Sequence, residues 1–267
     1  MVNDKFGEVM VEDKILEYLK GIEEKSNVRI LYACESGSRA WGFPSPDSDF
    51  DIRFIYVHSV DWYLSIDERK DAMDYMFENG DIDLSGWELR KALRLLKGSN
   101  MSLLEWPKSP IVYRANTQFL TDVQFLGEQF YSRIKGLHHY LSLARKMTES
   151  LVAERSFKLK KMLYALRAAT NCRWILDRSD PPPVEFKDTY SDLGLSSELT
   201  ERIDELIEFK QTKNESYLHT GEQLLVKYIL DCIDLADTGG RLLPSANGKV
   251  EDLNRVLRKY IYENDHS

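Results

Sequence analysis

Two short apolar runs flank a Gly-Ser pair and two closely spaced aspartates, and this order constrains the fold more than any other feature. The runs are Val28–Ala33 and Ile52–Val57, with Gly37-Ser38, Asp49 and Asp51 between them. Apolar runs of this length, bounded by turn-forming residues, are typical of strands. Residues i and i+2 of a strand point to one face, roughly 6–7 Å apart. Both carboxylates are therefore predicted to project from one side of a sheet, beside the Gly-Ser turn.

A third carboxylate is predicted on a later strand. After the turn signal Asn79-Gly80, acidic and apolar residues alternate in Asp81-Ile-Asp-Leu84. Both acids share one strand face, so the spacing leaves Asp83 and Asp81 open, with Asp83 preferred. Three carboxylates suit Mg²⁺, which takes hard oxygen ligands and keeps several waters.

This arrangement indicates phosphate chemistry, specifically nucleotidyl transfer. Two Mg²⁺ ions roughly 3.5–4 Å apart activate an attacking hydroxyl and stabilise leaving pyrophosphate. The Gly37-Ser38 turn lets backbone N–H groups and a hydroxyl approach phosphates, and Arg39 is placed for charge-assisted contact with them. The candidates are Asp49, Asp51 and Asp83 for catalysis and metal binding, and Gly37, Ser38 and Arg39 for the nucleotide.

Other common sites are excluded by their motifs. No GxxxxGK[ST] P-loop occurs, and the histidines are not at zinc-ligand spacing with cysteines. The neighbours His138 and His139 are predicted to form a surface pair on a helix.

Periodicity predicts an α+β domain over residues 1–112 and a helical domain over residues 113–267. In the first domain, helices are expected over residues 11–25 and Trp87–Lys97. In the second they are expected over Thr117–Ile134, Gly136–Leu151, Arg155–Asp177, Ser197–Gln211, Tyr217–Ala236 and Val250–Tyr262, the last poor in apolar residues and expected to pack loosely.

Charge is uneven along the chain. The net charge is −8, yet residues 131–176 hold ten basic residues and only two acidic ones. This segment fits a phosphate-bearing partner, although a solvated basic helix face explains it equally well. Three cysteines without a CxxC pair predict reduced thiols in the cytoplasm. No run approaches 18 apolar residues, so no membrane span is expected.

The motifs together resemble the DNA polymerase β-like nucleotidyltransferase superfamily, whose pattern is Gly-Ser, then [DE]-x-[DE], then a later acid. The match is closer to the branch associated with RNA-repair pathways. The matching stretches are Gly37-Ser-Arg-Ala-x-Gly42, Ser48-Asp-x-Asp51, Gly86-Trp-Glu-Leu-Arg-Lys91, Ser99-Asn100, Leu104-Glu-Trp106, Ser109-Pro-Ile-Val-Tyr113, Lys160-Lys-x-Leu-Tyr164-Ala-Leu-Arg167 and Cys172-Arg-Trp-Ile175.

The resemblance implies a polymerase β-like mixed sheet with flanking helices, followed by an all-α domain. It also implies Mg²⁺ and a nucleoside triphosphate. In relatives the helical domain closes over the nucleotide, which makes Lys161, Tyr164 and Arg167 candidates for binding it, although core packing by Tyr164 is an equal alternative. Asn100 and Glu105 are expected to cap or brace helices.

The leading interpretation is an enzyme that moves NMP, most simply AMP, from an NTP to an acceptor hydroxyl such as an RNA end. One alternative is a nucleotidyltransferase that modifies a protein or a small molecule such as an aminoglycoside. Another is a non-catalytic nucleotide-binding or antitoxin-like regulator. The sequence leaves the acceptor and the oligomeric state open.

Overall fold

The computed structural model describes residues 3–153, 156–240 and 243–265. In these residues five strands form a mixed sheet in the order β3-β4-β2-β1-β5. The strands are β1 (Arg29–Glu35), β2 (Phe50–Val57), β3 (Ala72–Phe77), β4 (Ile82–Glu88) and β5 (Val112–Ala115). β2 runs parallel to β4, whereas the other neighbouring pairs are antiparallel.

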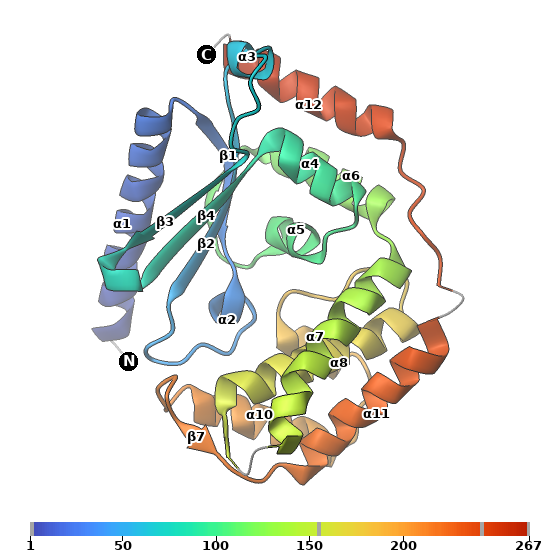
Figure 1. Cartoon of the computed structure of the whole chain (residues 1–267). Coiled ribbons are helices and arrows are strands. Elements are labelled where there is room, and N and C mark those ends of the chain that lie inside the picture. The colour runs from blue at the N-terminus through green and yellow to red at the C-terminus, as the bar shows by residue number, and fades with distance from the viewer. Residues whose placement is uncertain (1–2, 154–155, 241–242, 266–267) are drawn as a thin grey trace.

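Helices surround this sheet and then continue alone (Figure 1). The N-terminal half contains α1 (Asn3–Ser26), α2 (Gly37–Ala40), α3 (Val60–Tyr63), α4 (Leu89–Lys97) and α5 (Met101–Glu105), with 3₁₀ turns at Glu78–Gly80 and Trp106–Lys108. The remainder contains α6 (Thr117–Phe130), α7 (Arg133–Ala153), α8 (Leu159–Asp177), α9 (Phe186–Ser191), α10 (Ser197–Lys210), α11 (Gln223–Gly239) and α12 (Val250–Asp265). The α+β class is confirmed.

Each face of the sheet has its own core. On one face, α1 buries Ile15 and Leu19 against strand residues that include Ile52 and Leu84. On the other face, Ile55 belongs to a larger core that continues into the helical region. Burying each such side chain contributes about 1.5–3 kcal/mol. One end of β2 and β4 on this second face carries polar residues instead, and the site lies there.

Several predicted helix boundaries are wrong, because local contacts begin or end the helix at another residue. The expected helix from Trp87 begins at Leu89, since Trp87 and Glu88 belong to β4 and the Glu88 carboxylate accepts hydrogen bonds from the first-turn N–H groups. The helix expected over Thr117–Ile134 ends at Phe130, and the next, expected from Gly136, begins at Arg133. Between them, the N–H of Ser132 donates to Ser99 Oγ at 2.9 Å.

The predicted all-α second domain contains a small two-stranded sheet. β6 (Phe157–Lys158) pairs with β7 (Leu218–His219). The helices expected from Arg155 and Tyr217 therefore begin later, at Leu159 and Gln223; Arg155 itself lies outside the described residues. The second half is largely helical.

The last helix, α12, returns to the first half of the chain and lies beside α3 and α4 (Figure 1). Tyr260 is buried, and its hydroxyl donates to Asp122 at 2.7 Å. Lys259 pairs with the same carboxylate. The expectation of loose packing is wrong, because α12 buries the apolar residues of one face: Leu253, Val256, Tyr260 and Ile261. β5 (Val112–Ala115), which pairs with β1, crosses the proposed domain boundary at residue 112, and the boundary itself remains a prediction.

Candidate active site

The parallel pairing of β2 and β4 sets Asp51 directly beside Asp83. Asp49 immediately precedes β2, so all three acids lie near the same end of the strand pair. Asp81 is exposed and precedes β4, where its carbonyl oxygen accepts a bond from the Phe50 N–H at 2.8 Å. The structure therefore favours Asp83 over Asp81 as the partner of Asp51.

Arg53 lies between the two paired carboxylates. Its Nη2 is 2.9 Å from Asp51 Oδ1, and its Nη1 is 3.0 Å from Asp83 Oδ2. Burial raises the pKa of Asp51; the Arg53 charge lowers it, and the nearby Asp49 and Asp83 charges raise it further. Sequence reasoning missed Arg53, although its i+2 position on the same strand face was visible.

The turn before α2 fits tightly against Asp51. Gly37 has φ +62°, and a Cβ atom there would lie 2.1 Å from Asp51 Oδ2. The backbone of Asp51 is held as well, since its carbonyl oxygen accepts from the Ser36 N–H at 2.8 Å. Glycine at this position is thus required both by the backbone conformation and by the space that the carboxylate fills.

Glu35, which was not among the predicted site residues, holds the backbone of Asp51 through a hydrogen bond. This buried carboxylate accepts a bond from the Asp51 N–H at 2.7 Å and another from the Tyr113 hydroxyl. Burial raises its pKa to about 7. The available sequence signal was an acid at the end of an otherwise apolar strand, just before the Gly-Ser turn.

Arg39 connects the Gly-Ser turn to the first aspartate through backbone oxygens. Its guanidinium donates to the carbonyls of Ser48 at 2.9 Å and Asp49 at 3.2 Å, and lies over the Phe50 ring. Ser38 is buried and donates to Ser48 Oγ at 3.3 Å. Phosphate contact by Ser38 and Arg39 remains a prediction.

The three candidates on α8 occupy different environments. Tyr164 lines the same pocket as Asp51 and Asp83, and it packs edge-on to Trp41. Lys161 makes no ion pair with the described residues. Arg167 is buried, pairs with Glu105 at 2.9 Å and lies over Trp41, so it is held away from the pocket.

Neither lysine lines the pocket, but Lys160, rather than Lys161, contacts groups beside the pocket: its Nζ lies over the Tyr164 ring, 5.8 Å from the centroid. Its charge lowers the pKa of Asp51, and its Nζ is 3.6 Å from Glu215 Oε2. Position 160 is four residues before Tyr164, so the two share a helix face. The bracing role predicted for Glu105 and the capping role of Asn100 are both confirmed.

A pocket of about 370 Å³ joins the strand carboxylates to the helical region, a size within the ordinary range for small-ligand sites. Its walls combine acids, hydroxyls and aromatic rings: Ser36, Gly37, Trp41, Asp51, Arg53, Asp74, Asp83, Ser85, Trp87, Ser102, Trp106 and Tyr164. The mixture combines charged groups with aromatic surface on which a ring could stack.

The basic segment over residues 131–176 is only partly neutralised within the protein. Arg145 pairs with Asp237, Arg167 with Glu105 and Arg173 with Asp177, whereas Arg133 donates to backbone carbonyls. A phosphate-binding role for this segment remains a prediction. His138 and His139 are exposed, as predicted.

The donor set fits Mg²⁺ in chemistry, since all three side chains offer hard carboxylate oxygens. Asp51 and Asp83 each accept a hydrogen bond from Arg53 through one carboxylate oxygen, which leaves the second oxygen of each for a metal. Within the described residues, no ready-made cluster of three or more ligating side chains occurs. Metal binding would thus involve Asp49, Asp51 and Asp83 in competition with Arg53.

The described helices include none with the length and apolar content that a bilayer crossing demands. All three cysteines are buried and unpaired.

A mixed sheet that presents paired aspartates beside a Gly-Ser turn, followed by helices, defines a nucleotidyltransferase-like class. The family described as "RNA repair pathway DNA polymerase beta family" (RlaP) matches residues 11–259, and the chain belongs to this family. The Bacillus subtilis (strain 168) protein named "Uncharacterized protein YcgL" is 35% identical over 254 residues, covering 95% of this chain and 97% of YcgL.

A crystal structure of a nucleotidyltransferase-like protein from Exiguobacterium sibiricum is similar with a TM-score of 0.31 and 12% identity. The similarity covers 93% of this chain and 80% of that chain.

Proposed function

We propose that the protein is a metal-dependent nucleotidyltransferase that moves NMP, most simply AMP from ATP, to an acceptor hydroxyl. The observation that carries this proposal is the parallel register of Asp51 and Asp83 beside Gly37, with Asp49 immediately before the same strand. Family membership supports the same reaction class.

The reaction forms one bond and breaks one. The acceptor oxygen attacks the α-phosphorus, the bond to the pyrophosphate oxygen breaks, and the hydroxyl proton leaves to a base. Mg²⁺ bound by Asp49, Asp51 and Asp83 would neutralise charge on the phosphates and lower the pKa of the attacking hydroxyl. Asp83 keeps one carboxylate oxygen free of Arg53 and is the proposed proton acceptor.

The chain's other residues bind and orient the nucleotide in this proposal. The Gly37-Ser38 turn would receive the β- and γ-phosphates, and Lys160 would add a positive charge from α8. Trp41 and Tyr164 would shield the reacting groups from water, because they form one wall of the pocket.

An RNA 3′ end is the proposed acceptor, on the strength of the family's description. The net charge of −8 predicts modest, salt-sensitive RNA affinity.

The test is transfer of label from each α-³²P-NTP in turn, with Mg²⁺, to RNA ending in a 3′-hydroxyl. RNA with an oxidised 3′ end is the matched negative substrate. Label on the hydroxyl-ended RNA alone is the expected result. Label only on a protein or a small molecule would replace RNA by that acceptor, and no transfer to any pool would contradict the enzyme proposal.

A further inference from the structure

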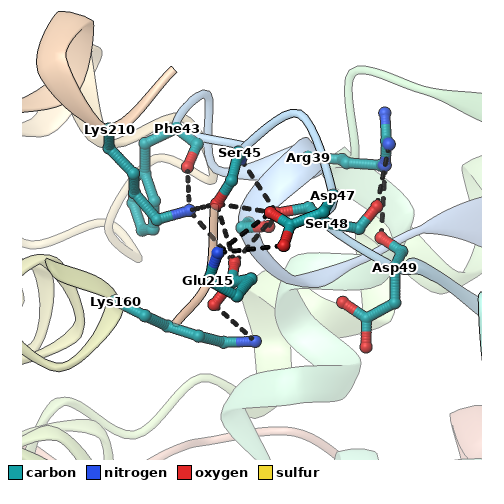
Figure 2. A network of polar contacts seen from close by, with 10 residues as sticks. Arg39, Phe43, Ser45, Asp47, Ser48, Asp49, Lys160, Lys210 and Glu215 are labelled. Atoms are coloured by element: carbon teal, nitrogen blue, oxygen red, sulfur yellow. Dashed lines mark hydrogen bonds and ion pairs between the residues drawn. The ribbon is translucent and has the colours of Figure 1, made fainter. Parts of the chain in front are cut away.

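Lys210, the last residue of α10, is a buried lysine with all its donors engaged. Its side chain is 2% exposed. Its Nζ donates to the carbonyl of Phe43 at 2.9 Å, to Ser45 Oγ at 2.7 Å and to Glu215 at 3.3 Å. An ammonium leaves water at high cost unless its three N–H groups find partners. The site is therefore built around this charge (Figure 2).

Glu215, five residues after Lys210, contacts the same segment around Ser45. Its Oε1 accepts hydrogen bonds from Ser45 Oγ at 2.9 Å and Ser48 Oγ at 3.0 Å. Its backbone N–H donates to Asp47 at 2.9 Å. Its other carboxylate oxygen faces Lys160, as Figure 2 shows. Residues 43–48 are thus held to the helical region by the side chains of Lys210 and Glu215 and by the Glu215 N–H group.

Residues 43–48 are the connection between the Gly-Ser turn and Asp49. Ser48 accepts from Ser38 through its hydroxyl and from Arg39 through its carbonyl. Arg39 also bonds the Asp49 carbonyl. Displacing this segment would move Arg39 and the first aspartate together.

We propose that Lys210 and Glu215 are positioning residues, which fix residues 43–48 and thereby hold Arg39 and Asp49 in register with Lys160. The inference rests on the proposed function, because it gives the nucleotide site a structural dependence on the helical region. Neither side chain lines the pocket, so both act through the segment they hold. Glu215 contacts both Lys160 and residues 43–48, so it links Lys160 of α8 to the segment that precedes Asp49.

Stability and positioning are separated by a double variant. Lys210→Met alone leaves Glu215 beside an apolar group and is expected to lower Tm by about 5 °C. Lys210→Met with Glu215→Gln removes both charges and is expected to recover most of that loss. Lys187→Met, at a lysine that is 71% exposed on α9, is the matched control.

The first readout is amide hydrogen exchange at Ser45 and Ser48, which requires no activity. The N–H of Ser45 donates to Ser48 Oγ, and that of Ser48 donates to the Ser45 carbonyl. We expect exchange at both to quicken about tenfold or more in the double variant and to stay at the wild-type rate in the control. Wild-type exchange in the double variant would overturn the proposal.

The second readout is the Kd for a non-hydrolysable ATP analogue with Mg²⁺. A roughly tenfold weaker Kd in the double variant, at near-wild-type Tm, is expected if the segment positions the site. Recovery of Kd together with Tm would show a purely structural pair and overturn the positioning role. If the wild-type protein binds no nucleotide, the proposed function fails. The exchange measurement then still decides whether Lys210 and Glu215 hold residues 43–48.

Discussion

Arg53 donates to the carboxylate of Asp51, its neighbour two positions earlier on the same strand face, at 2.9 Å. The same guanidinium reaches Asp83 on the adjacent strand. An arginine thus supplies the positive charge that a divalent ion would supply in the proposed reaction.

Removing Arg53 should therefore strengthen metal binding. Arg53→Met frees one oxygen on Asp51 and one on Asp83 and removes a repelling charge. We expect Mn²⁺ to bind about tenfold more tightly, equivalent to about 1.4 kcal/mol, measured by titration calorimetry without nucleotide. Arg69→Met, at an exposed arginine, is the control. Equal affinities in wild type and Arg53→Met would show that the guanidinium and the metal do not compete.

The carboxylates should differ sharply in their effect on catalysis. Asp49→Asn, Asp51→Asn and Asp83→Asn are each expected to reduce pyrophosphate release at least about 100-fold while leaving the fold intact. Asp81→Asn is the matched control, because this residue is exposed and contacts β2 through its backbone carbonyl, which the substitution keeps. A large loss in Asp81→Asn with normal rates in Asp83→Asn would reverse the assignment of the third carboxylate.

The two lysines at the start of α8 should separate in nucleotide binding. Lys160→Ala is expected to raise the KM for NTP about tenfold, since Lys160 lies over the ring of Tyr164, which lines the pocket. Lys161→Ala should have the smaller effect, because its side chain contacts no described acid. Steady-state kinetics on both variants checks this, and the opposite order would restore Lys161 as the phosphate ligand.

Gly37→Ala should destabilise the protein more than Gly42→Ala. Both glycines have positive φ, so each substitution strains the backbone by about 1 kcal/mol. Only at Gly37 would the new Cβ also meet the Asp51 carboxylate, whereas Gly42 has open space. We expect an additional loss of about 1–3 kcal/mol in the free energy of unfolding, measured in urea. Equal losses would mean that Asp51 moves aside freely.

His58 should make stability fall as pH falls. Burial, helped by the Arg69 charge, lowers its pKa to about 4, and its ring stacks on Trp62. Below pH 6.5 the unfolded chain binds a proton on His58 that the folded protein does not bind, so the free energy of unfolding declines between pH 6.5 and about 4. His58→Gln should flatten that decline by about 1–3 kcal/mol relative to wild type, as measured by urea unfolding across this range. His138→Gln, at an exposed histidine, should leave the pH profile unchanged.

Local patterns in the chain were sufficient for the elements that carry the site. The apolar runs around Gly37-Ser38 identify β1 and β2, and the alternation at Asp81–Leu84 identifies β4. Asn100 caps α5 because its side chain bonds an N–H group three residues away. β3 (Ala72–Phe77) was missed although five of its six residues are apolar or aromatic, because the charged residues 67–71 directly before it make the whole stretch look polar. These features depend on contacts within a few residues, which sequence spacing encodes directly.

The sequence by itself determined the α+β class, the Gly-Ser turn and the strand that carries Asp51, because period-2 and period-3.6 patterns fix which residues share a face. Only the tertiary structure decided which faces meet. It set Asp83 rather than Asp81 beside Asp51, placed Lys160 over the Tyr164 ring, buried Arg167 against Glu105, and brought Lys210 to Phe43. Such choices depend on strand order and helix docking between residues far apart in the chain, and periodicity carries no information about those partners.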